Sequence, residues 1–345
     1  MIVEVLFKLV EGRQVSAEEV SSCVDEMANG TATASQIAAL LTALRIRGET
    51  AELLAAMARV LRARAVKVRT EGKAIDTCGT GGDVIKTVNA STITGLIVAA
   101  GGGRVAKHGN RSYTGHTGSA DLLEELGVNI DVGPEVVERC IREVGFGFMM
   151  APRYHPSMKG VAVVRREIGI RTAFNLLGPL SNPAETKMHS MGVPSGELIP
   201  KMCDALRFLG VERAAVYHGS IGIDEVSPCS PTEVGWLWDG EVRYETLHPS
   251  DFGISRTPSD RLVVRDRREA VERAKRLISG ELERGDPDVQ LTLCNASVAL
   301  KVVGLSDDLR YGTELAWELL SSGRVLGVLR EVVRLTDGDV TRLDP

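Results

Sequence analysis

Aromatic side chains are scarce in this sequence of 345 residues, at 4% of the total. A hydrophobic core must therefore rest on Ala, Val, Leu and Ile. Long apolar runs are also lacking, because no stretch approaches the ~20 apolar residues that a membrane-spanning helix needs. The apolar opening segment, residues 1–7, is interrupted by Glu4 and does not have the layout of a signal peptide. These absences predict a protein with no membrane association.

Paired cysteines and an excess of positive charge are lacking as well. The six cysteines form no C-x-x-C pair and stand at positions 23, 78, 140, 203, 229 and 294. Such scattered thiols suit the reducing cytoplasm and argue against a zinc site or a disulfide framework. The formal net charge is −5, whereas dedicated nucleic-acid-binding proteins usually carry a basic balance. We therefore expect a cytoplasmic protein without a nucleic-acid partner.

What is present is ordinary globular material, with 43% hydrophobic residues and a mean hydropathy of +0.01. The length suffices for about two domains. The first 70 residues favour helices, because capping-box patterns at residues 16–19 and 33–36 and a capping Thr50 each precede an apolar stretch. Such short, Ala-rich helices cannot form a large core alone. We expect them to pack on the rest of the chain or on a second copy of it, which predicts a homodimer.

After residue 70 the sequence alternates between strand and helix patterns. Strands are expected at residues 74–77, 104–106 and 214–217, and helices at 93–100, 122–126 (capped by residues 119–121) and around 295–303. Alternation of this kind indicates an α/β domain with a mostly parallel central sheet. Ligands bind such sheets at the carboxyl ends of the strands. We therefore divide the chain into a helical domain, 1–70, and an α/β catalytic domain, 71–345.

A glycine-rich loop follows the first expected strand, at residues 79–83 (GTGGD). Its backbone N–H groups can approach an anion closely, because no side chain blocks the way. Two common nucleotide-binding motifs do not fit the loop. Val84 stands where a Rossmann fingerprint needs its last glycine, and Ile85 precedes Lys86 where a Walker A loop needs glycine. The loop alone is compatible with anion binding and equally with a flexible turn.

Two further polar segments lie close behind this loop. Asn89, Ser91 and Thr92 place hydroxyl and amide donors at the start of a helix, where anions bind readily. Residues 107–115 (KHGNRSYTG) add two cations, several donors and two glycines. Each segment alone has an ordinary explanation, as helix cap or solvated loop. Three such segments within about 40 residues favour a ligand with more than one phosphate group.

The adjacent carboxylates Asp224 and Glu225 follow another expected strand. Mg²⁺ typically takes one or two protein carboxylates together with substrate phosphates. An isolated Asp-Glu pair is more often ordinary surface charge. The pair therefore gains its meaning from the phosphate-binding segments around it.

Seven segments then occur in one order, and together they resemble the anthranilate phosphoribosyltransferase family. They are residues 79–83 (GTGGD), 89–92 (NAST), 107–111 (KHGNR), 118–121 (GSAD), 155–159 (HPSMK), 171–183 (RTAFNLLGPLSNP) and 222–225 (GIDE). The resemblance covers nearly the whole chain, and two of its runs are highly specific, residues 107–111 (KHGNR) and 175–180 (NLLGPL). It implies a small N-terminal helical domain joined to a larger α/β domain, as in nucleoside phosphorylases and phosphoribosyltransferases. The family is generally dimeric through the helical part, which some helices after residue 170 are expected to join.

The resemblance also implies a site and a reaction, in which the anthranilate amine takes the phosphoribosyl group of phosphoribosyl pyrophosphate in tryptophan biosynthesis. Two Mg²⁺ ions are implied, one held by Ser91 with Glu225 and the other by Asp224 with Glu225. Anthranilate is expected to meet Gly79, Asn110 and Arg165. The phosphoribosyl pyrophosphate site is expected to comprise Gly79, Gly82, Asp83, Thr87, Asn89, Ala90, Ser91, Thr92, Lys107, His108, Gly109, Asn110, Arg111, Ser112, Tyr113, Thr114, Gly115 and Ser119.

Physical chemistry fits these assignments. Loop donors and Mg²⁺ stabilise the negative charge that develops on departing pyrophosphate, and the planar fork of Arg165 matches a carboxylate. His108, His155 or water accepts the proton of the amine. Val84 replaces a glycine usual in the family, which makes the first loop stiffer.

Two other functions share this architecture. A pyrimidine nucleoside phosphorylase would use phosphate as nucleophile, but its phosphate motif differs from residues 107–111. A non-catalytic relative associated with nucleic acid is disfavoured by the acidic balance and by the intact pair Asp224 and Glu225.

Overall fold

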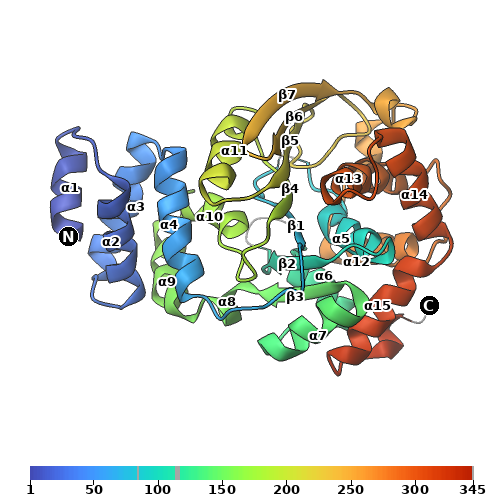
Figure 1. Ribbon diagram of the computed structural model, residues 1–345, viewed down its shortest axis with the longest axis horizontal. Coiled ribbons are helices and arrows are strands. Elements are labelled where there is room, and N and C mark those ends of the chain that lie inside the picture. The colour runs from blue at the N-terminus through green and yellow to red at the C-terminus, as the bar shows by residue number, and fades with distance from the viewer. Residues whose placement is uncertain (84, 113–116, 344–345) are drawn as a thin grey trace.

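The computed structural model describes residues 1–83, 85–112 and 117–343. Helices at one end adjoin a sheet whose faces are covered by other helices (Figure 1). The helices are α1 Ile2–Val10, α2 Ala17–Ala28, α3 Ala34–Arg47, α4 Ala51–Arg64, α5 Ala90–Ala100, α6 Ser119–Glu125, α7 Pro134–Val144, α8 Ala151–Tyr154, α9 Lys159–Ile168, α10 Phe174–Leu180, α11 Leu198–Phe208, α12 Arg267–Ile278, α13 Pro287–Val303, α14 Leu309–Ser321 and α15 Arg324–Leu335. Short 3₁₀ segments are Pro156–Met158, Pro249–Phe252, Ser259–Leu262 and Val340–Leu343.

Within the described residues, seven strands form one sheet in the order β3-β2-β1-β4-β5-β6-β7. They are β1 Ile75–Gly79, β2 Val105–Gly109, β3 Phe146–Met150, β4 Met188–Gly192, β5 Arg213–Gly219, β6 Thr232–Trp238 and β7 Glu241–Leu247. The first five pair in parallel, and β6 and β7 are antiparallel. The prediction of an α/β fold with a mostly parallel sheet is confirmed.

Side-chain alternation along the strands separates two layers of core. In β5, Ala215 and Tyr217 join the core formed with α5 and α13, whereas Ala214 and Val216 join the core formed with α4 and α11. This is the period of two expected of a strand covered on both faces. No helix within the described ranges has both the length and the apolar character needed to cross a membrane.

The N-terminal helices α1 to α4 form the helical end of the molecule, and α2, α3 and α4 begin where the caps predict. Ser16 and Thr33 each form a full capping box, and the hydroxyl of Thr50 accepts from the N–H of Leu53. Helices α9, α10 and α11 pack against this end and share its core. Since α9 begins at Lys159, helices before residue 170 also contact it.

Several element boundaries differ from expectation; helix α5, for example, begins at Ala90, three residues before the expected start. Helix α6 begins at Ser119, with Gly118 as its N-cap, so the predicted cap at residues 119–121 was placed too late. The carboxylate of Asp121 accepts from the N–H groups of Gly118 and Ser112, each at 2.9 Å. It therefore anchors two loop residues as well as the helix start. Helix α13 begins at Pro287, eight residues before the expected helix around 295–303.

Candidate active site

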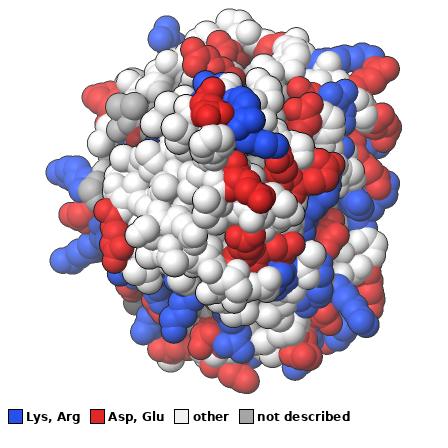
Figure 2. Space-filling view, turned by 90° about the vertical axis from the view of Figure 1, so that its left-hand side faces the viewer, with Lys and Arg blue, Asp and Glu red and all other residues white. Residues whose placement is uncertain are grey.

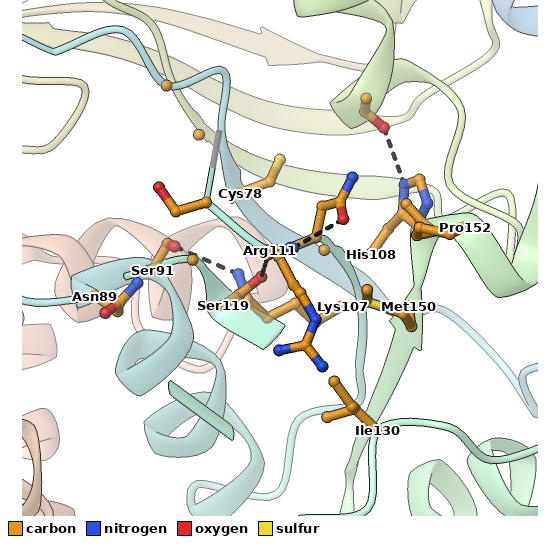
Figure 3. Close-up of a pocket in the computed structure, with 18 of the residues that line it drawn as sticks. Cys78, Asn89, Ser91, Lys107, His108, Arg111, Ser119, Ile130, Met150 and Pro152 are labelled. Carbon is orange, nitrogen blue, oxygen red and sulfur yellow. Dashed lines mark hydrogen bonds between the residues drawn. The ribbon is translucent and has the colours of Figure 1, made fainter. Parts of the chain in front are cut away.

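A cavity of about 1400 Å³ lies at the carboxyl ends of the parallel strands, between the sheet and helices α9 and α10. Figure 3 shows side chains from several loops pointing into it. Most of the residues singled out from the sequence line this cavity: Gly79, Gly82, Asp83, Thr87, Asn89, Ser91, Lys107, His108, Gly109, Asn110, Arg111, Ser112, Ser119, His155, Arg165, Asp224 and Glu225.

Ala90 and Thr92 do not line the cavity. Both are buried in the first turn of α5, and their N–H groups bond to the carbonyls of Val88 and Asn89. Their expected part in phosphate binding therefore finds no support in side-chain placement. Tyr113, Thr114 and Gly115, together with Val84, lie outside the described residues.

The glycine-rich loop after β1 is built for close contact. Gly81 and Gly82 have positive φ values of 65° and 94°, a conformation that costs glycine little. A Cβ atom on Gly82 would lie 1.8 Å from Nη1 of Arg171. Arg171 in turn donates to the carbonyl of Gly81 at 3.1 Å. Only glycine at position 82 lets this arginine cover the loop.

The second loop is anchored by ion pairs. Arg111 forms a two-pronged pair with Glu124, at 2.7 and 2.8 Å, and also contacts Asp121 at 3.2 Å. The guanidinium is thus already matched by carboxylates. Lys107 is buried, and its Nζ donates to the carbonyl of Thr77 and to the Ser91 hydroxyl at 3.3 Å (Figure 3). Burial lowers the pKa of Lys107, and the nearby Asp76 opposes that shift.

The two carboxylates after β5 are held together at the bottom of the cavity. Oδ2 of Asp224 accepts from the N–H of Gly81 at 2.9 Å. The main chain of Ser91 lowers the pKa of the Glu225 carboxylate, yet the buried Oε2 of Glu225 has no hydrogen-bond partner among the described residues. Burial raises the pKa of Asp224 to about 6 and that of Glu225 well above its ordinary value, and repulsion between the two carboxylates adds to the latter.

The positive charges of Lys86 and Lys107 oppose these shifts but do not cancel them. The Ser91 hydroxyl and the oxygen atoms of Asp224 and Glu225 are hard ligands that suit Mg²⁺. A divalent cation would neutralise both carboxylates and give the orphaned Oε2 a partner. The residues present therefore fit a magnesium site.

His108 and His155 face each other with ring centroids 5.1 Å apart. Nδ1 of His108 donates to the carbonyl of Gly178 at 3.0 Å (Figure 3), so its lone pair resides on Nε2. Burial lowers the pKa of His108 to about 3 and that of His155 to about 4. Both imidazoles are therefore neutral at pH 7.

Arg165 and Arg166 are neighbours in α9 with different surroundings. Arg165 is half-buried, lines the cavity, and has its Cζ atom 5.4 Å from the ring centre of Phe174. Arg166 is exposed and is not part of the lining. This placement separates the two side chains as the motif resemblance does.

Several lining residues were not assigned a role from the sequence. Lys86 pairs with Asp83 at 2.9 Å, and Arg171, Phe174 and Asn175 also line the cavity. The last three lie within residues 171–183, a segment of the resemblance that includes the specific run 175–180, but no contact was deduced for them from the sequence. The specific run at residues 175–180 was the sequence signal that pointed to this part of the cavity, because an ordinary helix start does not require it.

Comparisons with known proteins agree with the architecture. Residues 3–65 match the helical bundle domain and residues 71–326 the a/b domain of a glycosyl transferase family. The anthranilate phosphoribosyltransferase of Methanopyrus kandleri is 44% identical over 336 residues, which are 96% of this chain and 99% of that protein. The enzyme of that name from Persephonella marina is 41% identical, covering 98% of this chain and all of that protein.

Solved structures give the same result. The anthranilate phosphoribosyltransferase of Thermus thermophilus superposes with a TM-score of 0.90 at 38% identity, covering 96% of this chain and 99% of the other. The Saccharomyces cerevisiae enzyme in complex with phosphoribosyl pyrophosphate and Mg has a TM-score of 0.88 at 26% identity, covering 97% and 98%. The resemblance read from the motifs is thereby confirmed. The chain belongs to the anthranilate phosphoribosyltransferase family and carries both the helical bundle domain and the a/b domain of the glycosyl transferases.

Proposed function

We propose that this protein transfers the phosphoribosyl group of phosphoribosyl pyrophosphate to the amine of anthranilate. The observation that carries the proposal is a single cavity that joins three donor-rich loops, a buried carboxylate pair and Arg165. Relatives named anthranilate phosphoribosyltransferase align over nearly the whole chain. A bond forms between the amine nitrogen and the anomeric carbon, the bond from that carbon to pyrophosphate breaks, and the amine releases a proton.

Phosphoribosyl pyrophosphate is assigned to the side of the cavity formed by the loops after β1 and β2. Residues 79–83 and the polar residues Thr87, Asn89, Ser91 and Ser119 line that side. Lys107 supplies positive charge beside Ser91. Residues 90, 92 and 113–115 stay in the proposal on the motif resemblance alone.

The magnesium site is assigned to Ser91, Asp224 and Glu225. Ser91 with Glu225 would hold one Mg²⁺, and Asp224 with Glu225 a second. When bound, Mg²⁺ supplies the charge that stabilises departing pyrophosphate. The orphaned Oε2 of Glu225 supports this assignment.

Anthranilate is assigned to the wall formed by Gly79, Asn110 and Arg165. A guanidinium accommodates a carboxylate with two parallel hydrogen bonds, and Arg165 reaches the cavity from α9 beside the Phe174 ring. That ring offers a planar apolar surface to an aromatic substrate. The proton of the amine passes to water, to His155 or to the Nε2 lone pair of His108.

A homodimer through the helical end is part of the proposal. Helix α1 buries Ile2, Val5 and Leu9, yet its other side exposes Val3, Phe7 and Val10. Figure 2 shows that the surface at this end of the molecule has a broad area without charged side chains. Apolar patches of this kind mark interaction sites.

A reducing, cytoplasmic location is also part of the proposal, and the six free, buried thiols support it.

A fluorescence assay of anthranilate tests the function. Anthranilate fluorescence should fall when phosphoribosyl pyrophosphate and Mg²⁺ are both present, and should stay constant when either is omitted. Thymidine with phosphate should yield no thymine, and a DNA gel shift should show no complex. Constant anthranilate fluorescence in the complete mixture, or thymine release, would overturn the proposal.

A further inference from the structure

The segment that carries Asp224 and Glu225 folds back on the end of β5. Gly219 and Ile223 exchange backbone hydrogen bonds at 3.0 and 3.3 Å. The turn places both carboxylates above the ends of β1 and β4. These two bonds join the turn to β5, and one side-chain bond, from the N–H of Gly81 to Oδ2 of Asp224, joins it to the loop after β1.

Below the turn, two strand ends leave room for it. A Cβ atom on Gly192, the last residue of β4, would lie 1.6 Å from the carbonyl oxygen of Asp224. A Cβ atom on Gly79 would lie 2.5 Å from Oδ2 of Asp224. Side chains essentially never approach so closely. The main chain of Asp224 therefore rests directly on Gly192, which does not line the cavity.

On the side of the turn that faces α13, the side chain of Asn295 makes two hydrogen bonds to the main chain of Val226, the residue after Glu225. Oδ1 of Asn295 accepts from the N–H of Val226 at 2.9 Å, and Nδ2 donates to the carbonyl of Val226 at 3.1 Å. A further bond from Nδ2 to the carbonyl of Leu291, at 2.8 Å, orients the amide. Asn295 is fully buried and, like Gly192, is not part of the cavity lining.

These contacts bear on metal binding because Glu225 has few others. Its Oε2 bonds to no described residue, so no hydrogen bond fixes this oxygen, and the main chain sets the point from which the side chain reaches the cavity. We propose that Asn295 is a positioning residue. It holds the main chain of Asp224 and Glu225 against Gly192, which has no side chain, so that both carboxylates are placed to bind the cation. The inference rests on the proposed function, since it assumes a cation at this pair.

Mn²⁺ binding in the presence of phosphoribosyl pyrophosphate tests the inference without turnover. Free Mn²⁺ is measured by electron paramagnetic resonance, with anthranilate omitted. Asn295→Ala should weaken Mn²⁺ binding about 10- to 100-fold, as loss of residues that support metal ligands typically does. In separate kinetics at saturating Mg²⁺, the KM for anthranilate should stay within twofold of the original. Unchanged Mn²⁺ affinity in Asn295→Ala would overturn the inference.

Ser297→Ala is the matched control. Ser297 is buried on the same helix, and its hydroxyl donates to the carbonyl of Leu309 at 2.6 Å, away from the metal pair. It should lower the Tm but leave Mn²⁺ affinity unchanged. An equal loss of Mn²⁺ affinity in both variants would reduce Asn295 to a general structural role and overturn the inference.

Gly192→Ala is an independent variant, should Asn295→Ala fail to fold. It should also weaken Mn²⁺ binding, because the added methyl group displaces Asp224. Gly327→Ala, in α15, meets nothing within 4 Å and should leave binding unchanged. If the unaltered protein binds no Mn²⁺ with phosphoribosyl pyrophosphate, the proposed function itself fails. If it does bind, and Gly192→Ala and Asn295→Ala bind equally well, only the positioning role fails.

Discussion

Neighbouring residues of one helix can have unrelated roles, and Arg165 and Arg166 in α9 illustrate this. Arg165→Ala should raise the KM for anthranilate about tenfold to 150-fold, because a charge-assisted hydrogen bond contributes ~1.5–3 kcal/mol. The KM for phosphoribosyl pyrophosphate should change little. Steady-state kinetics with each substrate varied in turn measures both values.

Arg166→Ala is the control for this prediction, since Arg166 is exposed and lies outside the cavity lining. Its kinetics should match those of the original protein. Equal behaviour of the two variants, or a loss confined to phosphoribosyl pyrophosphate, would show that Arg165 does not hold the anthranilate carboxylate.

Three buried histidines should remain neutral well below pH 6.5. Burial lowers the pKa to about 3 for His108 and His189 and to about 4 for His155. The unfolded chain binds more protons than the folded one between these values and 6.5, so these groups contribute stability that is lost as pH falls through that window. Imidazole ¹⁵N shifts should stay constant from pH 7.5 to 5.5, while free histidine titrates. A midpoint near 6.5 for any of the three would contradict this prediction.

Residues within motifs could be predicted from the sequence, and residues that support them could not. The pair Asp224 and Glu225 is visible as adjacent carboxylates after a strand. Gly192 and Asn295 carry no local signal, because their roles arise from segments that meet only in the folded chain. Arg171 stood in a noted segment, but its contact with Gly81 depends on a loop 90 residues away.

At the scale of elements, helices with caps and one apolar side were predicted best. Both capping boxes and the Thr50 cap lie at the expected positions. The first half of α13 was missed although Asp286 caps it and Pro287 opens it. Its residues are buried nearly all round, so the amphipathic period that reveals a surface helix is absent.

A buried arginine connects α4 to α10. Arg62 on α4 is buried, and its Nε donates to the carbonyl of Leu180, at the end of α10, at 2.7 Å. Burial lowers the pKa of Arg62 to about 10, so the side chain is still charged at pH 7. Arg62→Met should lower the free energy of unfolding by about 1–3 kcal/mol, because the carbonyl of the buried Leu180 loses its donor. Urea denaturation measures this change.

Arg64→Met on the same helix is the comparison. Arg64 contacts Asp25 at 2.7 Å and Asn29 at 2.8 Å near the surface, where an ion pair contributes about 0–1 kcal/mol. An equal decrease in the free energy of unfolding in the two variants would show that the contact between α4 and α10 stabilises the protein no more than a surface ion pair does.

At the scale of the whole molecule, the exposed apolar end predicts a dimer. Phe7 is 59% exposed, Val10 81% and Ile46 79%. Light scattering at micromolar concentration should give twice the chain mass of 37.1 kDa. Phe7→Asp with Ile46→Asp should give a monomer, because two charges would be buried without partners at the interface.

Tyr311→Asp tests whether any exposed apolar residue would act alike. Tyr311 is 59% exposed on α14, at the opposite end of the molecule from α1 (Figure 1). This variant should remain dimeric. A clean monomer of the original protein would remove the proposed interface.

The most direct test of the whole account measures pyrophosphate release against anthranilate consumption in the original protein and in Asp224→Asn with Glu225→Gln. The original protein should release one pyrophosphate per anthranilate consumed. The double variant should remain folded by circular dichroism and show no turnover, because two neutral amides cannot hold the cation that balances departing pyrophosphate. Near-normal turnover of the folded double variant at ordinary Mg²⁺, or pyrophosphate release without anthranilate consumption, would contradict the account.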